Sequence, residues 1–380
     1  MSAEKTPDVI VVGAGIVGAA CAYFLVKRKL SVLVLDSRFP GAGVTAAGMG
    51  HLVVMDDSEA QFALTACSRR LWSELAAALS PDCEDDPCGT LWIAADEEEL
   101  NTVRRKADFY GHRGIQTEIL DGRALAAEEP NLRPGLAGAL LVPGDRVLYP
   151  PNAARWLMEE ARRLGVEFRG GCTVTGIDAT SARHGDRRIE AAAIVNAAGP
   201  EAPRLTPGLP IEPRKGHLVI TDRYPGFCRH QLVELGYLKS AHSMTPSSVA
   251  FNAQPRSTGQ ILLGSSREFA GWETTVNPQI LGRMIRRGIE FMPALANLSA
   301  VRAWTGFRPA TPDNLPLIGR WSNAQGPGPW IAAGHEGLGI TTALATGHLI
   351  AALISGSTPQ IDPSPFAPNR PMPGLAHGIS

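Results

Sequence analysis

The sequence predicts an α/β fold in which a Rossmann-like, dinucleotide-binding domain is interleaved with a second, α+β domain. A strand–glycine–helix–strand unit at residues 8–36 supports the first domain, and buried strands at residues 191–196 and 330–333 return to its pattern. The stretches between them carry hairpins and helices that a simple doubly wound sheet does not contain. A length of 380 residues is too great for one small core, so we expect two domains.

The first unit has the pattern of a dinucleotide-binding βαβ motif. Residues 8–12 form an apolar, β-branched run typical of a buried parallel strand, and Gly13-Ala14-Gly15-Ile16-Val17-Gly18 follows with G-x-G-x-x-G spacing. Residues 19–29 have helical spacing of apolar side chains with cations at the end. Residues 30–35 form a second apolar run, which ends in Asp36.

Each part of this motif has a physical role in such a site. Gly13 allows a tight turn, Gly15 lets the backbone approach a pyrophosphate, and Gly18 lets the helix pack closely on the strand. The exposed N–H groups at the start of the helix favour phosphates. Asp36 stands where a carboxylate accepts hydrogen bonds from ribose hydroxyls. We therefore predict a dinucleotide site, against the alternative of a glycine-rich βαβ unit without a ligand; the motif leaves open which dinucleotide is bound.

Composition and charge exclude several other classes of function. The formal net charge is −1 with both signs interspersed, which gives no electrostatic case for binding nucleic acid or an anionic membrane. No uninterrupted apolar run reaches the roughly 18–20 residues of a membrane span. Residues 1–7 are polar and lead directly into the first strand, so we expect no signal peptide and a cytoplasmic location.

The cysteines give no sign of a metal centre. They lack Cys-x-x-Cys spacing, so we expect neither an iron–sulfur cluster nor a zinc site, and we predict no metal site. Free thiols are the expectation for an intracellular chain. Cys83 and Cys88 flank an acidic loop, and we expect both at the surface. The six cysteines are Cys21, Cys67, Cys83, Cys88, Cys172 and Cys228.

Residues 37–55 form a loop rich in small residues, among them Gly41, Gly43 and Gly48. So many small side chains indicate backbone that passes close to something bulky. A flat cofactor is the favoured interpretation, because the loop directly follows the ribose-binding acid; a tight turn packed under a helix is the alternative. Residues 58–79 then predict a long amphipathic helix.

The later elements alternate between the two domains. We predict strands at residues 89–94, 138–143, 166–168, 172–174, 216–221, 248–254 and 260–264, the last two as a hairpin. We predict helices at residues 97–112, 121–129, 151–164, 278–292 and 340–355, and an irregular, proline-rich tail from Gly356. The dinucleotide-binding domain is assigned residues 1–87, 151–209 and 308–380, and the second domain is assigned residues 88–150 and 210–307.

Further motifs extend along nearly the whole chain, at residues 12–18, 46–49, 194–200, 305–309, 311–313 and 334–340. In this order they resemble the glycine oxidase/D-amino-acid oxidase family of FAD-dependent oxidoreductases. The resemblance implies FAD in the Rossmann-like domain, a substrate domain built on a mixed, largely antiparallel sheet over the flavin, and oxidation of an amine next to a carboxylate. Residues 334–342 look most like D-hydroxyproline dehydrogenases and hydrogen cyanide synthase flavin subunits, because glycine oxidases tend to carry an arginine where this chain has Gly337.

The resemblance also implies the cofactor contacts. The pyrophosphate would lie on Gly13, Gly15, Ile16 and Val17, the ribose on Asp36 and Ser37, and the adenine against the backbone of Val174. The start of the last helix would face the pyrimidine ring of the flavin, where a helix N-terminus favours the anionic reduced form by up to about 2 kcal/mol. The remaining cofactor positions are Gly18, Ala42, Gly43, Ala47, Gly48, Met49, Ala198, Gly199, Gly334, His335, Glu336, Gly337, Leu338, Gly339, Ile340 and Thr341.

FAD is expected to bind without a covalent bond. The segment at residues 304–307 lacks the cysteine that tethers the flavin in monomeric sarcosine oxidases. Thr45 stands near the position where some dehydrogenases place a tethering histidine.

Arg308 is the main substrate-binding candidate. In the family, the arginine of this Gly-Phe/Leu-Arg-Pro motif clamps the substrate carboxylate over the flavin. A guanidinium fork matches a carboxylate bidentately and keeps its charge at any working pH. The alternative is a structural arginine paired with an acid such as Asp313.

Two further residues are candidates for setting the side-chain specificity. Asn252 aligns with a tyrosine that contacts the substrate in glycine oxidases, and its amide could bond a ring hydroxyl; an amide in an ordinary sheet position is the alternative. His51 follows the small-residue loop and could reach the pocket, although a lone histidine is more often packed or at the surface. Met55 and Glu336 are weaker candidates.

Together these features predict oxidation of a D-imino acid, of the D-hydroxyproline or D-proline type, to the cyclic imine. Hydride would pass from the α-carbon to flavin N5, and the electrons to an acceptor other than NAD. One alternative is a glycine or D-amino-acid oxidase that uses oxygen. The other is a flavin subunit of a heteromeric dehydrogenase, whose partner subunits would carry the electrons onward.

Overall fold

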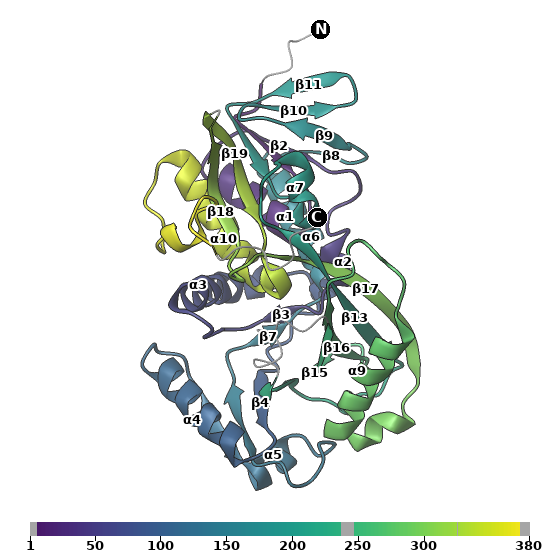
Figure 1. Cartoon of the computed structure of the whole chain (residues 1–380). Coiled ribbons are helices and arrows are strands. Elements are labelled where there is room, and N and C mark those ends of the chain that lie inside the picture. Colours follow the sequence, from purple (N-terminus) through teal and green to yellow (C-terminus); the bar gives the residue numbers. More distant parts are fainter. Residues whose placement is uncertain (1–5, 237–246, 325, 373–380) are drawn as a thin grey trace.

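A computed structural model describes residues 6–236, 247–324 and 326–372 of the chain (Figure 1). Residues 1–5 of the expected polar N-terminal segment and residues 373–380 of the expected irregular tail lie outside the described residues. The two large sheets form the two halves of the molecule. A six-stranded sheet lies in the upper half of Figure 1, and an eight-stranded sheet lies in the lower half.

The six-stranded sheet has the order β18-β19-β12-β1-β2-β8. All neighbouring pairs are parallel except β18 and β19, which pair antiparallel. The strands are β1 (Val9–Val12), β2 (Val32–Leu35), β8 (Glu167–Arg169), β12 (Ala193–Asn196), β18 (Leu317–Asn323) and β19 (Gly326–Ala333). Strands β1, β2 and β12 are buried along their whole length, which explains their continuous apolar runs.

Alternate residues of β1 face the two sides of this sheet. Val9 and Val11 pack into a core with four helices, and Ile10 and Val12 pack into a second core on the opposite face. The helices are α1 (Ile16–Lys27), α3 (Glu59–Leu75), α6 (Pro150–Arg163) and α10 (Gly339–Ser355). The opposite face is covered by a three-stranded antiparallel sheet of β9 (Val174–Ile177), β10 (Ser181–His184) and β11 (Arg187–Glu190).

The eight-stranded sheet has the order β17-β13-β16-β15-β14-β4-β6-β5 and is antiparallel except between β14 and β4. Its strands are β4 (Thr90–Ala94), β5 (Glu118–Asp121), β6 (Gly138–Val142), β13 (Glu212–Thr221), β14 (Gln231–Glu234), β15 (Ser247–Pro255), β16 (Ile261–Glu268) and β17 (Ala300–Ala310). Its helices are α4 (Glu97–Gly111), α5 (Gly122–Glu128) and α9 (Pro278–Phe291). The predicted fold class is confirmed: a parallel Rossmann-like sheet and a mixed, largely antiparallel sheet occur in one chain.

Short elements connect the two halves. β3 (His51–Leu52) pairs with β7 (Arg146–Val147). In the part of the chain that the structure describes, the other helices are α2 (Val44–Ala47) and α7 (Ala202–Leu205), and the 3-10 helices are η1 (Ala76–Ala78), η2 (Pro81–Cys83), η3 (Gly199–Glu201), η4 (Pro293–Asn297), η5 (Glu336–Leu338) and η6 (Ser364–Phe366).

Strand β17 corrects one expected domain boundary. The boundary between residues 307 and 308 falls inside this strand, which pairs with β13 from Glu212 to Thr221. Arg308 therefore belongs to the eight-stranded sheet, opposite Arg214, and not to the cofactor half of the chain. The hairpin of β15 and β16 occurs as predicted, whereas β14 and β17 were not among the predicted strands.

The expectation that Cys83 lies at the surface is wrong. Its exposed fraction is 0 %, and its side chain packs into the core beside the six-stranded sheet. The acidic loop folds back, with Asp86 bridging to Val147 and the N–H of Tyr149 donating to the Cys83 carbonyl oxygen at 2.6 Å. Cys88 is partly buried, and all six cysteines are free thiols.

Among the described residues, one helical segment, Glu336–Ser355, is long and apolar enough to cross a membrane. Most of this segment is buried, and α10 packs against both α1 and α3. The approach is so close that a Cβ added to Gly347 would lie 2.5 Å from the backbone of Ala20. The apolar residues of this segment are therefore explained by its packing in the core of the molecule.

Candidate active site

The carboxyl ends of three adjacent strands form the first part of the site. Gly13 follows β1 with φ +108°, and a Cβ there would lie 2.5 Å from the carbonyl oxygen of Ala197, which follows β12. Asp36 follows β2, and its Oδ2 accepts a hydrogen bond from the N–H of Ala14 at 2.6 Å. Ligands of open α/β sheets bind at this edge, so the predicted dinucleotide motif lies where the fold requires it.

The start of α1 offers N–H groups to an anion. Its N-cap, Gly15, has no capping side chain, and within the described residues the N–H groups of Gly15, Val17 and Gly18 have no acceptor. The N–H of Ile16 donates to Thr45 Oγ1 at 3.0 Å. Unpaired N–H groups at a helix N-terminus are the chemistry that holds a pyrophosphate.

Asp36 still has capacity for a ribose. Its Oδ1 accepts from the N–H of Arg38 at 2.7 Å and its Oδ2 from Ala14, so about two of its four lone-pair positions remain. The N–H of Cys172 donates to the Asp36 carbonyl oxygen at 2.8 Å, which brings the start of β9, with Val174, beside the exposed Ser37. The predicted ribose and adenine positions are thus neighbours.

The small-residue loop joins this edge to the other half of the molecule. A Cβ on Gly48 would lie 2.8 Å from Ile340 Cδ1 at the start of α10. On the other side, a Cβ on Gly306 of β17 would lie 2.6 Å from Ala47 Cβ, and one on Gly264 of β16 would lie 3.1 Å from Met49 Sδ. The loop is therefore wedged between α10 and the eight-stranded sheet, so the absence of side chains at these glycines is a packing requirement.

The segment before α10 is held by a buried histidine. His335 Nε2 is 3.0 Å from Thr346 Oγ1, and burial lowers the pKa of His335 to about 3, so the ring is neutral. The Oγ1 of Thr341 donates to the carbonyl oxygen of His51 at 2.7 Å. These bonds fix the N-terminus of α10 beside β3 and support a structural role for His335.

These residues fit FAD. Contacts run without a break from Asp36 and Ala14, through Gly15 and Thr45, to Gly48 and Ile340, and they connect unpaired N–H groups, glycines and a helix N-terminus in one path. Ala198 and Gly199 lie after β12, beside Gly13, and Ala42 and Gly43 lie in the loop between. Every predicted cofactor position is a described residue.

A cavity of about 90 Å³ lies next to the end of this path, between the eight-stranded sheet and the elements β3 and α3. Three of the predicted specificity residues, His51, Asn252 and Met55, line it together with Glu336. The lining is His51, Val53, Met55, Asp57, Gln61, Trp92, Gln231, Val233, Asn252, Arg267, Asn314, Glu336, Gly337 and Leu338. The structure therefore brings the predicted substrate residues to one place.

Arg308 does not itself line this cavity but lies beside Gly337, which does. Its guanidinium extends over Gly216 of β13, where a Cβ would lie 2.4 Å from Nη1, and Nη1 donates to the Ser266 carbonyl oxygen of β16 at 2.9 Å. A Cβ on Gly337, which lines the cavity, would lie 3.5 Å from Arg308 Nε. Glycines on both sides thus leave room for the guanidinium.

The alternative prediction, that Arg308 pairs with Asp313, is wrong. Asp313 pairs with Arg370 instead, at 2.7 and 2.8 Å. Within the described residues Arg308 makes no ion pair within 4 Å, although it is one of three arginines that stabilise the charge of Glu336.

Glu336 is a carboxylate among three arginines. Its Oε1 lies 3.4 Å from Arg267 Nε and 3.9 Å from Arg214 Nη1, and its Oε2 accepts from the N–H of Gly337. Burial opposes its charge, but Arg267, Arg308 and Arg214 together hold the pKa of Glu336 at about 2. The group carries a net positive charge at neutral pH, which suits a substrate with a carboxylate.

Glu336→Gln should destabilise the protein by about 3 kcal/mol at pH 7, because it removes a buried negative charge that lies beside Arg267 and Arg214. The folded pKa of about 2 lies below an unfolded value of about 4.3. The carboxylate therefore stabilises fully above about pH 5, and this stabilisation is lost as the pH falls toward 2. Urea unfolding should show a constant gap between wild type and variant from pH 7 to about pH 5, and the gap should close as the pH falls from about 5 toward 2.

Glu74→Gln provides the control for that measurement, since Glu74 is exposed and pairs only with Arg70 on the surface of α3. Its effect should stay below about 1 kcal/mol at every pH. A gap for Glu336→Gln that does not change with pH would contradict the assigned electrostatic role.

Several site residues were not predicted from the sequence. Arg214 and Arg267 lie on strands of the eight-stranded sheet, and Trp92, Gln231 and Gln61 line the cavity. Trp92 could have been found from the periodicity of its predicted strand. Gln231 could not, because its four-residue strand with polar ends gives no clear pattern.

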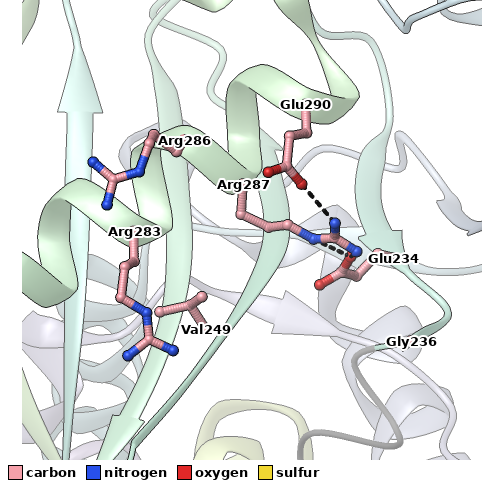
Figure 2. Close-up of a pocket in the computed structure, with 7 residues that line it drawn as sticks. All are labelled: Glu234, Gly236, Val249, Arg283, Arg286, Arg287 and Glu290. Carbon is pink, nitrogen blue, oxygen red and sulfur yellow. Dashed lines mark hydrogen bonds and ion pairs between the residues drawn. The ribbon is translucent and has the colours of Figure 1, made fainter.

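A larger hollow, of about 440 Å³, lies elsewhere, between α9 and the strands β14 and β15 (Figure 2). Arg287 bonds both acids of the hollow, Glu234 and Glu290 (Figure 2). Arg283 Nη1 donates to Ser247 Oγ at 3.2 Å. None of the predicted cofactor or substrate residues lines it. We therefore place the candidate site in the smaller cavity, beside the cofactor path.

Comparison with known proteins agrees with this geometry. The model of the family described as FAD dependent oxidoreductase (DAO) matches residues 8–353. The chain is 29 % identical to hydrogen cyanide synthase subunit HcnC of Pseudomonas protegens, with 96 % of both chains covered. It is 27 % identical to a glycine oxidase of Pseudomonas putida, with 95 % of this chain and 98 % of the relative covered.

Solved structures show the same architecture. The glycine oxidase of Geobacillus kaustophilus superposes with a TM-score of 0.86 at 26 % identity, over 97 % of this chain and 100 % of that one. The L-proline dehydrogenase of P. horikoshii also gives a TM-score of 0.86, at 24 % identity, over 96 % and 98 % of the two chains. The second likeness is evidence for the fold alone.

Proposed function

The chain belongs to the DAO family of FAD-dependent oxidoreductases, and from this premise we propose that it oxidises a D-imino acid of the D-proline or D-hydroxyproline type to the cyclic imine. The observation that carries the proposal is Arg308, which lies beside the cavity between two glycines and has no ion-pair partner among the described residues. A guanidinium in this state is ready to bind a carboxylate bidentately.

The protein contributes mainly binding and orientation to this reaction. Arg308 would hold the substrate carboxylate, and the walls of the cavity would exclude water from the α-carbon. Bound FAD supplies the acceptor for the hydride that leaves the α-carbon. The substrate nitrogen, bound as the neutral amine, loses a proton, which completes the imine.

His51 is a hydrogen-bonding residue in this scheme. Burial lowers its pKa to about 3, so at neutral pH the ring is uncharged. Its Nε2 is buried without a partner beside the cavity, where it can accept a hydrogen bond from the substrate amine. We do not assign it the role of general base, because a pKa so low makes it a weak one.

The wall of the cavity supports a cyclic substrate. Val233 and the ring of Trp92 offer apolar surface to ring carbons, and Asn252 offers an amide beside them. Gly337 stands where glycine oxidases tend to carry an arginine, and its lack of a side chain leaves space at the cavity. A substrate larger than glycine is consistent with that space.

A second candidate is oxidation of glycine or another D-amino acid with oxygen as acceptor, which the similarity to glycine oxidases favours. The first candidate passes electrons to another acceptor. A relative named as a subunit of a synthase supports partner subunits for that transfer. We further propose that FAD is held without a covalent bond and that the protein works in the cytoplasm.

Anaerobic mixing of the purified flavoprotein with D-proline, cis-4-hydroxy-D-proline, glycine and sarcosine tests the proposal. Bleaching of the flavin band by the cyclic D-imino acids at the lowest concentrations is the expected result. Bleaching by glycine or sarcosine alone would replace it with the second candidate. In air, release of peroxide would identify an oxidase, and acid precipitation should release the flavin into the supernatant.

A further inference from the structure

We propose that Trp92 and Gln231 form a polar subsite that binds a hydroxyl group on the ring or side chain of the substrate. This inference rests on the proposed function, because it concerns the part of the substrate that lies beyond its carboxylate and amine. It adds two specificity-determining residues, and it assigns the substrate to the hydroxylated members of its class.

The first evidence is a concentration of unpaired polar atoms in one cavity. Buried side-chain polar atoms almost always have a hydrogen-bond partner, because leaving one unpaired is costly. Five residues that line the cavity are exceptions, because each has one buried polar atom without a hydrogen-bond partner. A bound ligand could supply that partner. The five atoms are His51 Nε2, Gln61 Oε1, Trp92 Nε1, Gln231 Oε1 and Asn252 Oδ1.

The register of the sheet brings Trp92 and Gln231 together. Trp92 of β4 is paired with Val233 of β14, and Gln231 lies two residues before Val233, so all three side chains are on the same face. Trp92 and Gln231 are therefore diagonal neighbours, within reach of long side chains. Their side chains are almost completely buried, with exposed fractions of 2 % and 1 %.

The position of this pair relative to Arg308 suits a small substrate. The guanidinium of Arg308 reaches across β13 to the Ser266 carbonyl oxygen of β16. Only β15 and β14 separate β16 from β4 in the sheet. Asn252 lies on β15, between the guanidinium and the polar pair. A substrate held by its carboxylate would thus extend past Asn252 and direct its far end at Trp92 and Gln231.

The two polar atoms together select a hydroxyl group. The indole Nε1 of Trp92 can only donate, and the Gln231 carbonyl oxygen can only accept. A hydroxyl group donates and accepts, so it satisfies both. A second carboxylate would face the Gln231 oxygen with no donor, and an ammonium group would face the Trp92 N–H with no acceptor.

The charge near this pair is balanced within the protein. Lys106 Nζ lies 4.4 Å from the centroid of the Trp92 ring, but it forms an ion pair with Asp56. The positive charge of Lys106 beside Trp92 is therefore offset by Asp56. This also favours a neutral hydroxyl over a charged substituent.

The test compares cis-4-hydroxy-D-proline with D-proline by the rate of anaerobic flavin reduction. For each compound, the measured quantity is the rate constant of flavin reduction divided by the substrate concentration that gives half of the maximal rate. In the wild type, this ratio should be larger for cis-4-hydroxy-D-proline than for D-proline. Trp92→Phe and Gln231→Met should each reduce this preference about tenfold, through the hydroxylated compound alone. Trp156→Phe on α6, a buried tryptophan outside the cavity, is the control and should leave the preference unchanged.

The possible results separate the subsite from the proposed function. Equal losses for both compounds in both variants would assign the two residues a structural role and overturn the subsite. If neither cyclic compound bleaches the wild type, the proposed function fails, and D-serine against D-alanine then provides the hydroxyl comparison in the same variants. A preference for D-serine that the variants abolish would support the subsite, and no preference would overturn it.

Discussion

Replacing Arg308 with alanine should raise the KM for the substrate by about two to three orders of magnitude while FAD stays bound. Truncating one partner of a hydrogen-bonded charge pair costs about 2–5 kcal/mol, and each 1.4 kcal/mol corresponds to about tenfold. The guanidinium is anchored by the Ser266 carbonyl oxygen and approaches Gly337 at the cavity, while the predicted phosphate-binding groups lie at the start of α1. Steady-state kinetics and the flavin absorbance of the purified variant measure both properties.

Arg302→Ala is the matched control for this experiment. Arg302 lies on the same strand, β17, but it is exposed and stacks over Trp304. Its removal should change KM by less than about twofold, since exposed side chains contribute little. Loss of flavin from Arg308→Ala, with KM unchanged in the remaining holoenzyme, would assign Arg308 to the structure and remove the main support for the proposed substrate class.

Gly13→Ala should yield protein with little or no FAD and a lowered melting temperature. Gly13 has φ +108°, which alanine adopts only under strain, and the new Cβ would lie 2.5 Å from the Ala197 carbonyl oxygen. The Cβ is fixed to the backbone of residue 13 and the oxygen belongs to the backbone of Ala197, so neither can move without separating the strand ends at the cofactor site. The ratio of flavin to protein absorbance and a thermal melt measure the two effects.

Gly185→Ala separates backbone strain from the clash. Gly185 also has a positive φ, +55°, but a Cβ there would meet nothing within 4 Å. We expect a loss of about 1 kcal/mol in the free energy of unfolding and full flavin content. If Gly13→Ala retained FAD as well as this control does, the close approach of β1 and β12 would not be needed for cofactor binding.

The first strand, the glycine motif and Asp36 could be predicted because each has a local signature. Continuous apolar runs mark strands buried on both faces, and the glycines are required by close contacts near their own positions in the chain. Strand β17 was missed although its residues 305–309 were recognised as a motif. Most of its residues are only partly buried, so it has neither a continuous apolar run nor a clean alternation.

The candidate site was predictable only in part, because its partners come from distant strands. The motif around Arg308 indicated a carboxylate clamp, but nothing local indicates that its guanidinium reaches Ser266, or that Asp313 pairs with Arg370. Trp92 and Gln231 became neighbours only through the parallel pairing of β4 with β14, across more than a hundred residues of chain. Pairing of this kind depends on tertiary packing rather than on local sequence.

The strand order of the six-stranded sheet has a consequence for how the protein is made. On the ribosome, β1, β2, β8 and β12 emerge before β19 and α10, which complete the sheet and its helical face. Until then, the face of α1 that α10 covers is exposed to solvent, and chains stalled or cut before Gly339 should aggregate. Because α10 also borders the predicted flavin end of the cofactor path, FAD incorporation is expected to follow the synthesis and packing of α10.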